Sequence, residues 1–203
     1  MTRLGVLLSG RGSNFQAIAA SIDAGLIPAE IALVIGNRPD AGGLDVARQR
    51  GLTALSLPSK GLDRETYDAQ LIDALRAHRI DWVILAGYMR ILSAGFIRAF
   101  PHRILNIHPS LLPAFPGLDA QHQAFDYGVR IAGCTVHFVD EHLDHGPIVM
   151  QAAVDVDPAD TPDSLSARIL AEEHRIYSAS IRRLLTEPWR IDGRRVVFNP
   201  AAS

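Results

Sequence analysis

Two polar residues, Asn106 and His108, lie in the short apolar segment Ile104–His108. Side chains alternate along a strand, so both would point to one face, and Pro109 favours an extended conformation at His108 and ends the strand there. An amide and a charged imidazole can both donate to a carbonyl oxygen that becomes negative, and the imidazole can also move a proton from an attacking amine. The pair is therefore typical of acyl transfer, although the same two side chains could instead cap neighbouring loops.

A polar turn further along the chain, residues 140–147, could supply a carboxylate for His108. A carboxylate beside an imidazole favours the charged form of the ring and orients it. Asp140, Glu141 and Asp144 are all eligible, and the local pattern does not choose among them.

Histidines are crowded in the same part of the chain. Six of the eight lie between residues 102 and 145, namely His102, His108, His122, His137, His142 and His145. A metal site made from His137, His142, His145 and Asp144 is one interpretation. Their spacing matches no recognisable ligand motif, and histidines in loops are usually solvated, so we expect no metal. We expect His137 to line or support the site, and assign the others besides His108 to loops and the surface.

A glycine-rich turn, Ser9–Asn14, follows the first apolar run. Glycines permit unusual backbone angles, and Ser13 or Asn14 could cap a following helix. Exposed amides and the helix dipole at such a point favour phosphate binding. A dinucleotide site is not indicated, because Phe15 takes the third glycine position and Asn37 stands where an acidic residue is expected. The turn predicts a site for one phosphate, the alternative being a tight turn that binds nothing.

Short apolar runs alternate with amphipathic stretches. Runs typical of buried strands are Leu4–Leu8, Ile31–Ile35, Thr53–Leu57, Trp82–Ala86 and Ile104–His108. Helical patterns cover Asn14–Ala24, Asp63–Arg79 and Ser164–Leu185, with further strands at Gly133–Val139 and Ile148–Val154 and a short hairpin at Trp189–Val197. The alternation predicts an α/β fold with one doubly wound, mostly parallel sheet, helices on both faces and a long C-terminal helix. In such sheets ligands bind beyond the carboxyl ends of the strands.

Composition excludes several classes of function. The 203 residues indicate one domain, which we place at residues 1–198 with a tail at 199–203. Lys and Arg number 20 against 22 Asp and Glu, so a net charge of −2 offers no basic surface for nucleic acid or membrane. With Cys134 as the single cysteine and no signal peptide or apolar span at the start, we expect a cytoplasmic protein with small-molecule partners.

Five stretches together resemble the phosphoribosylglycinamide formyltransferases, a family of folate-dependent enzymes of purine biosynthesis, over essentially the whole chain. The stretches are Leu8–Asn14, Leu85–Leu92, Leu105–Pro113, Gly133–Val139 and Leu143–Pro147. Their order and spacing are specific for the folate formyltransferase superfamily, whereas the segment from His108 to Pro113 alone is shared with its relatives. The resemblance implies a Rossmann-like fold and transfer of the formyl group of 10-formyltetrahydrofolate to the amine of 5-phosphoribosylglycinamide.

The resemblance also implies roles for individual residues. Asn106 and His108 would stabilise the tetrahedral oxyanion, with His108 also the proton donor, and Asp144 would favour the charged form of His108. Glu173 would meet the substrate amine. Gly12, Ser13 and Asn14 would hold the substrate phosphate. The folate would be received by Arg64, Met89, Arg90, Ile91 and Leu92 together with Asn106. Asp119 departs from relatives that carry His or another residue at that position, so we assign it no role.

Three alternatives differ from this interpretation. A formyltetrahydrofolate deformylase has similar core motifs, uses water in place of the amine and usually carries an additional amino-terminal domain. A methionyl-tRNA formyltransferase would need a further carboxyl-terminal domain and a basic surface. A non-catalytic nucleotide-binding domain would leave the combination of Asn106, His108 and Asp144 unexplained. The sequence does not distinguish a monomer from a homodimer.

Overall fold

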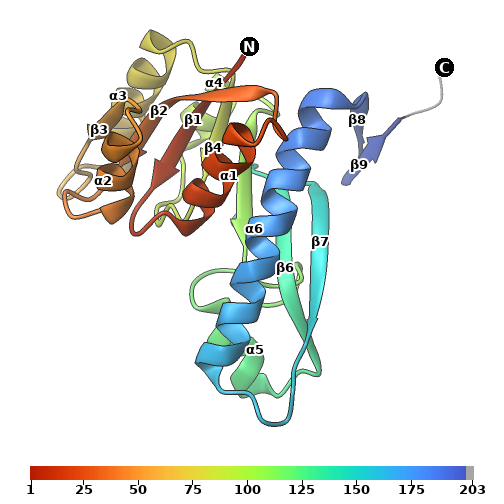
Figure 1. Cartoon of the computed structure of the whole chain (residues 1–203). Coiled ribbons are helices and arrows are strands. Elements are labelled where there is room, and N and C mark those ends of the chain that lie inside the picture. The colour runs from red at the N-terminus through yellow and green to blue at the C-terminus, as the bar shows by residue number, and fades with distance from the viewer. Residues whose placement is uncertain (200–203) are drawn as a thin grey trace. The chain divides into compact units, whose positions relative to one another are not determined.

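The computed structural model describes residues 1–199, so residues 200–203 of the expected tail lie outside the described part (Figure 1). The chain divides into two compact units, Met1–Asn106 and a second unit that begins at Ile107. Among residues 1–199, no helix is long and apolar enough to cross a membrane.

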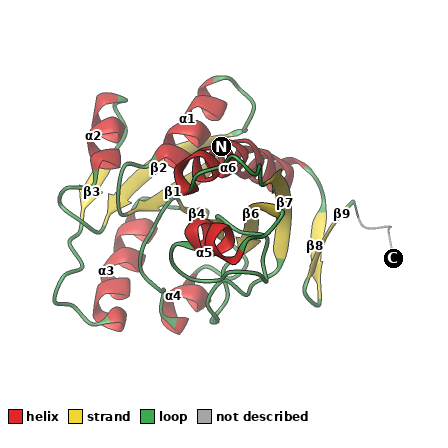
Figure 2. Cartoon of the chain, turned by 90° about the horizontal axis from the view of Figure 1, so that it is seen from below, coloured by secondary structure: helices red, strands yellow, loops and turns green. Residues whose placement is uncertain are grey.

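The first unit alternates strands and helices in chain order. Its elements are β1 (Thr2–Leu8), α1 (Ser13–Asp23), β2 (Ala29–Gly36), α2 (Gly42–Gln49), β3 (Ala54–Ser56), α3 (Arg64–Ala77), β4 (Trp82–Leu85), α4 (Ala94–Ala99) and β5 (Ile104–His108), of which β5 continues into the second unit. The strands lie in the order β3-β2-β1-β4-β5 and every pair is parallel. Figure 2 shows α1 and α2 on one face of this sheet and α3 and α4 on the other.

The core of the first unit follows directly from its apolar strands. Val6, Leu7 and Leu8 of β1 are fully buried, because the central strand is covered by helices on both faces. The helix α3 begins after Asp63, whose side chain accepts a hydrogen bond from the backbone N–H of Thr66. Parallel strands and their crossover helices place the loops that follow β1 and β4 at the same edge of the sheet.

The second unit is mostly antiparallel. It contains α5 (Ala120–Tyr127), β6 (Ile131–Phe138), β7 (Ile148–Asp155), α6 (Pro162–Thr186), β8 (Trp189–Asp192) and β9 (Arg195–Phe198). Strands β6 and β7 are antiparallel neighbours, as are β8 and β9, while β7 meets β9 in parallel through one residue pair, Ile148 and Arg195. The turn that joins β6 to β7 carries the polar segment 140–147.

The long helix α6 packs against β6 and β7 of the second unit. It begins with a capping box between Thr161 and Ser164, and Pro162 takes its first position. Its buried face includes Leu165, Ile169, Ile176 and the carboxylate residue Glu173. A buried charge on an otherwise apolar face marks a position where packing alone does not explain the residue type.

The structure confirms the predicted α/β class, the parallel strands and the long C-terminal helix. It also contains three helices that the sequence pattern missed, α2, α4 and α5. Each has only six to eight residues, too few for a helical period to be separated from its surroundings. The predicted C-terminal hairpin is present, and its two turn residues are Gly193 and Arg194.

Candidate active site

The glycine-rich loop after β1 leads into α1 through Gly12, which occupies the cap position in a left-handed conformation with φ of 70°. The expected side-chain cap by Ser13 or Asn14 is wrong, since both residues lie inside the first turn and no side-chain hydrogen bond caps this helix. The loop is held instead by backbone, with the N–H of Gly43 donating to the carbonyl of Gly10 at 3.0 Å. The positive end of α1 therefore carries first-turn amides without a side-chain cap.

The segment that follows β4 is connected by hydrogen bonds to two neighbouring loops of the first unit. The N–H of Met89 donates to the Oγ of Ser9 at 2.8 Å. The guanidinium of Arg90 lies 4.8 Å from the centre of the Tyr67 ring and donates to the carbonyl of Ser59 at 3.1 Å. Arg90 is thus engaged with protein groups, and its contacts fix the backbone around it.

Apolar side chains of the same segment differ in exposure. Met89 and Ile91 are about half exposed, at 57% and 50%, while Leu92 is buried. Arg64, the first residue of α3, is exposed. Exposed apolar residues next to a backbone held by hydrogen bonds are suited to contact a flat, partly apolar ligand.

Two buried polar residues that the sequence analysis did not single out hold loops near the predicted site residues. Asp68 is 1% exposed and accepts a hydrogen bond from the N–H of Ser93 at 2.5 Å, which fixes the end of the 89–92 segment. Thr135 of β6 is fully buried, donates to the carbonyl of Ser110 at 2.7 Å and accepts from the N–H of Leu112 at 3.1 Å. An acidic residue on the apolar face of a helix, as Asp68 is on α3, was a signal available in the sequence.

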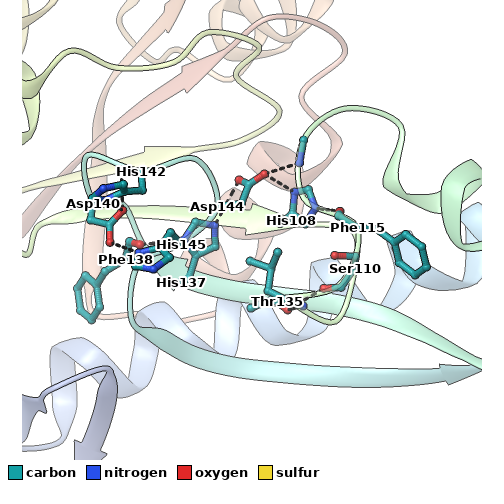
Figure 3. A network of polar contacts seen from close by, with 12 residues as sticks. His108, Ser110, Phe115, Thr135, His137, Phe138, Asp140, His142, Asp144 and His145 are labelled. Atoms are coloured by element: carbon teal, nitrogen blue, oxygen red, sulfur yellow. Dashed lines mark hydrogen bonds and ion pairs between the residues drawn. The ribbon is translucent and has the colours of Figure 1, made fainter.

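His108 stands at the end of β5 with acceptors facing both ring nitrogens (Figure 3). Its Nδ1 lies 3.4 Å from Oδ2 of Asp144, and its Nε2 donates to the carbonyl oxygen of Phe115 at 2.8 Å. The side chain of His108 is 5% exposed and that of Asp144 is 9% exposed. Only the doubly protonated imidazolium has a proton for each of these oxygens, so the geometry suits the charged ring.

Asp144 itself is held in place by the backbone. It adopts a left-handed conformation with φ of 49°, which is unusual for a residue other than glycine. Its Oδ2 accepts the N–H of Gly117 at 2.8 Å in addition to facing His108. Of the three carboxylates that the sequence left open, Asp144 is the one that contacts His108, whereas Asp140 contacts His145 at 3.0 Å.

His137 of β6 lies on the other side of the Asp144 carboxylate. Its Nε2 is 3.8 Å from Oδ1 of Asp144, and its Nδ1 donates to the carbonyl of Phe138 at 2.8 Å. Burial lowers the pKa of His137 below its ordinary value, more than the neighbouring carboxylate raises it. His137 is therefore a neutral partner near neutral pH, and the negative charge of Asp144 is left to His108.

The structure brings two of the predicted catalytic residues, His108 and Asp144, into contact. Asn106, two residues earlier in β5, is half-buried and ends the first unit. Glu173 is 6% exposed on α6, and its charge is the second cause, after burial, that raises the pKa of the buried Cys134 thiol to about 12. His102, His142 and His145 are exposed outside helices and strands, while His122 is exposed but lies in α5 and not in a loop.

The fold and the buried pair of His108 and Asp144 define an α/β protein with a group suited to proton transfer at the end of a strand. Residues 2–181 match the family model described as formyl transferase, and the chain belongs to this family.

Relatives within the family cover most of the chain. It is 42% identical over 198 residues to a phosphoribosylglycinamide formyltransferase of Escherichia coli, covering 97% of this chain and 91% of the relative. It is 39% identical to one from Bacillus subtilis, covering 91% and 95%. A trifunctional purine biosynthetic protein of Drosophila melanogaster is 47% identical over 186 residues, and there the chain spans 90% of its own length but only 14% of the relative.

Solved structures agree with the sequence relatives. A glycinamide ribonucleotide transformylase of Symbiobacterium toebii superposes with a TM-score of 0.95 at 52% identity, covering 98% of this chain and 94% of that chain. A formyltetrahydrofolate deformylase of Pseudomonas syringae superposes with a TM-score of 0.90 at 28% identity, covering 98% and 66%. The chain is thus more similar in sequence to the transformylase than to the deformylase.

Proposed function

We propose that this chain transfers the formyl group of 10-formyltetrahydrofolate to the amine of 5-phosphoribosylglycinamide, giving 5-phosphoribosyl-N-formylglycinamide and tetrahydrofolate. The step belongs to one-carbon metabolism and to the de novo route to purines. The observation that carries the proposal is the buried contact between His108 and Asp144 at the end of β5, in a chain whose relatives carry this name over most of its length.

The charged imidazole is the central chemical group. Transfer begins when the substrate amine attacks the formyl carbon, and the carbonyl oxygen becomes negative in the tetrahedral intermediate. The His108 ring, kept charged and oriented by Asp144, donates to that oxygen together with the amide of Asn106. In the structure the Nε2 of His108 donates to the Phe115 carbonyl, so the formyl oxygen would replace this acceptor.

Proton balance gives His108 and Glu173 separate tasks. A new bond forms between the amine nitrogen and the formyl carbon, the bond from that carbon to N10 of the folate breaks, and one proton passes from the amine to N10. His108 is the proton donor to the leaving nitrogen. If the amine arrives as a cation it must lose one further proton before it attacks, and Glu173, a buried carboxylate, would accept that proton and pass it to solvent.

The substrate phosphate is assigned to the start of α1. Gly12 allows the sharp entry into the helix, and the first-turn amides that include Ser13 and Asn14 have no side-chain cap. A phosphate satisfies such amides and is favoured by the helix dipole. Because the loop lacks the sequence pattern of a dinucleotide site, we assign it a single phosphate.

The folate is assigned to Arg64 and the segment from Met89 to Leu92. The exposed side chains of Met89 and Ile91 would contact the flat pterin and benzoyl parts of the folate. Backbone groups of the segment would form hydrogen bonds with the polar edge of the pterin. Arg64 is an exposed cation suited to the glutamate carboxylates of the folate. Arg90 supports the segment through Tyr67 and Ser59.

An assay with and without the amine substrate separates the proposed transferase from a deformylase. Purified protein with 10-formyltetrahydrofolate is expected to release tetrahydrofolate only when 5-phosphoribosylglycinamide is present. The variant His122→Ala, which removes an exposed histidine of α5, is the control and is expected to match the unchanged protein. Equal release without the amine would replace the proposal by hydrolysis.

The remaining properties stay predictions. The proposed reaction uses 10-formyltetrahydrofolate as co-substrate and no metal. Its partners are small molecules, with neither nucleic acid nor membrane among them. A cytoplasmic location is expected from the composition, and either a monomer or a homodimer is compatible with the sequence.

A further inference from the structure

The turn between β6 and β7 contains a second polar cluster that the proposed reaction does not use. Nδ1 of His145 lies 3.0 Å from Oδ2 of Asp140, and Nδ1 of His142 lies 4.0 Å from the other oxygen of Asp140. One ligand atom from each of these three residues can be chosen so that all lie within 4.8 Å of one another (Figure 3). We call Asp140, His142 and His145 the turn cluster.

The chemistry of the turn cluster favours a particular class of cation. Two imidazoles and one carboxylate suit Zn²⁺, Ni²⁺ or Cu²⁺, whereas Mg²⁺ and Ca²⁺ prefer oxygen ligands alone. Ligand bonds to Zn²⁺ of about 2.0–2.2 Å require the three atoms to draw closer together than they are in the structure. His142 and His145 are exposed and can turn toward a shared ion, and water would complete the coordination.

A protein cation already contacts this cluster. Arg194, in the turn between β8 and β9, places Nη1 3.0 Å from Nδ1 and 2.8 Å from Nε2 of His145, and its Nη2 donates to the carbonyl of His145 at 2.5 Å. A metal ion would coordinate one ring nitrogen of His145 in the plane of the ring, within a few ångströms of this guanidinium, and two positive charges repel at such distances. A metal would therefore bind in competition with Arg194.

The position of the cluster links it to the buried acid–base pair. Asp144 lies between His142 and His145 in the chain, and its carboxylate faces His108. The backbone at Gly146 lies close against the end of β6, since a Cβ there would be only 1.9 Å from the carbonyl oxygen of Phe138. Rotation of the two exposed side chains together with movement of the turn would bring their ligand atoms onto one ion, and Asp144 lies in the part of the turn that would move.

We propose that the turn cluster binds a borderline divalent transition metal such as Zn²⁺ in competition with Arg194, and that binding inhibits the enzyme by moving Asp144 relative to His108. The binding stands on the cluster itself, while the inhibition rests on the proposed function. The two parts need separate measurements.

Binding is measured on the full chain by competition between the protein and a chromophoric zinc chelator, without substrates. One Zn²⁺ per chain is expected. The double variant His142→Ala/His145→Ala should weaken binding by more than about tenfold, since loss of even an outer-shell partner costs 10–100-fold. Arg194→Gln should bind Zn²⁺ more tightly, and His122→Ala, which removes an exposed histidine outside the cluster, should be unchanged.

Two results would overturn the binding part. Zinc affinity in the double variant equal to that of the unchanged protein would place the ion elsewhere, for example at His108 and His137. Affinity in Arg194→Gln no higher than in the unchanged protein would remove the competition with the guanidinium.

Inhibition is measured as formyl transfer in the presence of Zn²⁺, followed by removal of the ion with a chelator. Activity should fall as the measured site fills and return on chelation, while the double variant, active without metal, should resist the same zinc concentration. Full activity at saturated zinc would contradict the inhibition and leave the site standing. Absence of transfer in metal-free buffer would instead count against the proposed function, because the binding measurement uses no substrate.

Discussion

The turn between β6 and β7 carries two aspartates, Asp144 and Asp140, and the shortest contact of each with a histidine differs from the other in almost everything except residue type. Asp144 and His108 are 3.4 Å apart with side chains 9% and 5% exposed, whereas Asp140 and His145 are 3.0 Å apart and 34% and 52% exposed. The exposed contact is the shorter one, yet water and salt screen it. The comparison teaches that burial, more than distance, decides which pair can hold a charge in place for chemistry.

Removing the imidazole of the buried pair is expected to have the largest effect. His108→Ala takes away both an oxyanion donor and the proton donor, so kcat should fall by about 10²–10⁴. Steady-state formyl transfer measures it, with His122→Ala as the matched exposed-histidine control. A rate near that of the unchanged protein would remove His108 from the mechanism.

Changing the carboxylate of the buried pair should lower kcat less than removing the imidazole does. Asp144→Asn keeps the size of the side chain but removes its charge, and we expect kcat to fall by about 10–100-fold, the scale for losing a group that orients a functional side chain. Steady-state formyl transfer measures the change, and a kcat equal to that of the unchanged protein would contradict the role of Asp144.

The neutral histidine beside Asp144 should make folding stability sensitive to acid. Burial lowers the pKa of His137 from 6.5, so below that pH the unfolded chain binds a proton that folded His137 does not. Its contribution is full above pH 6.5 and is lost as pH falls toward the lower folded value. Urea unfolding at several pH values should show a shallower acid loss in His137→Gln, and identical slopes in both proteins would refute this.

The exposed pair should contribute least. Asp140→Asn removes its charge, and an exposed ion pair is worth about 0–1 kcal/mol, so the free energy of unfolding in metal-free buffer should change by no more than that. Addition of 1 M salt should shrink the difference further, because screening is strong at that concentration. A larger loss that persists in high salt would show that exposure is a poor guide here.

The same comparison explains what the sequence could predict. Alternation in β5 identified Asn106 and His108 from five residues of strand, because a strand repeats every two residues. Spacing could not choose among Asp140, Glu141 and Asp144, since the answer depends on a left-handed residue and on Gly117 reaching across from another loop. Local patterns fix the faces of regular elements, and they do not fix the path of a turn.

Residues that position loops of the site were harder to predict from the sequence than the site residues themselves. Thr135 and Asp68 act through hydrogen bonds to backbone groups far away in sequence, so a local pattern can mark Asp68 as unusual on its helix face but cannot identify the partner of either residue. The expected cap of α1 by Ser13 or Asn14 failed because Gly12 enters the helix in a left-handed conformation. His142 and His145 were correctly predicted to lie at the surface, but their position around Asp140 depends on the path of the folded turn.

The claim that His108 and Asp144 act as one unit is tested most directly by a double-mutant cycle on kcat. If Asp144 works through the imidazole, adding Asp144→Asn to His108→Ala should cost almost nothing further, and the coupling should equal nearly the whole effect of Asp144→Asn alone. If the two losses instead multiply, so that the double variant is slower than His108→Ala by the full factor seen for Asp144→Asn, the buried pair is not the catalytic unit described above.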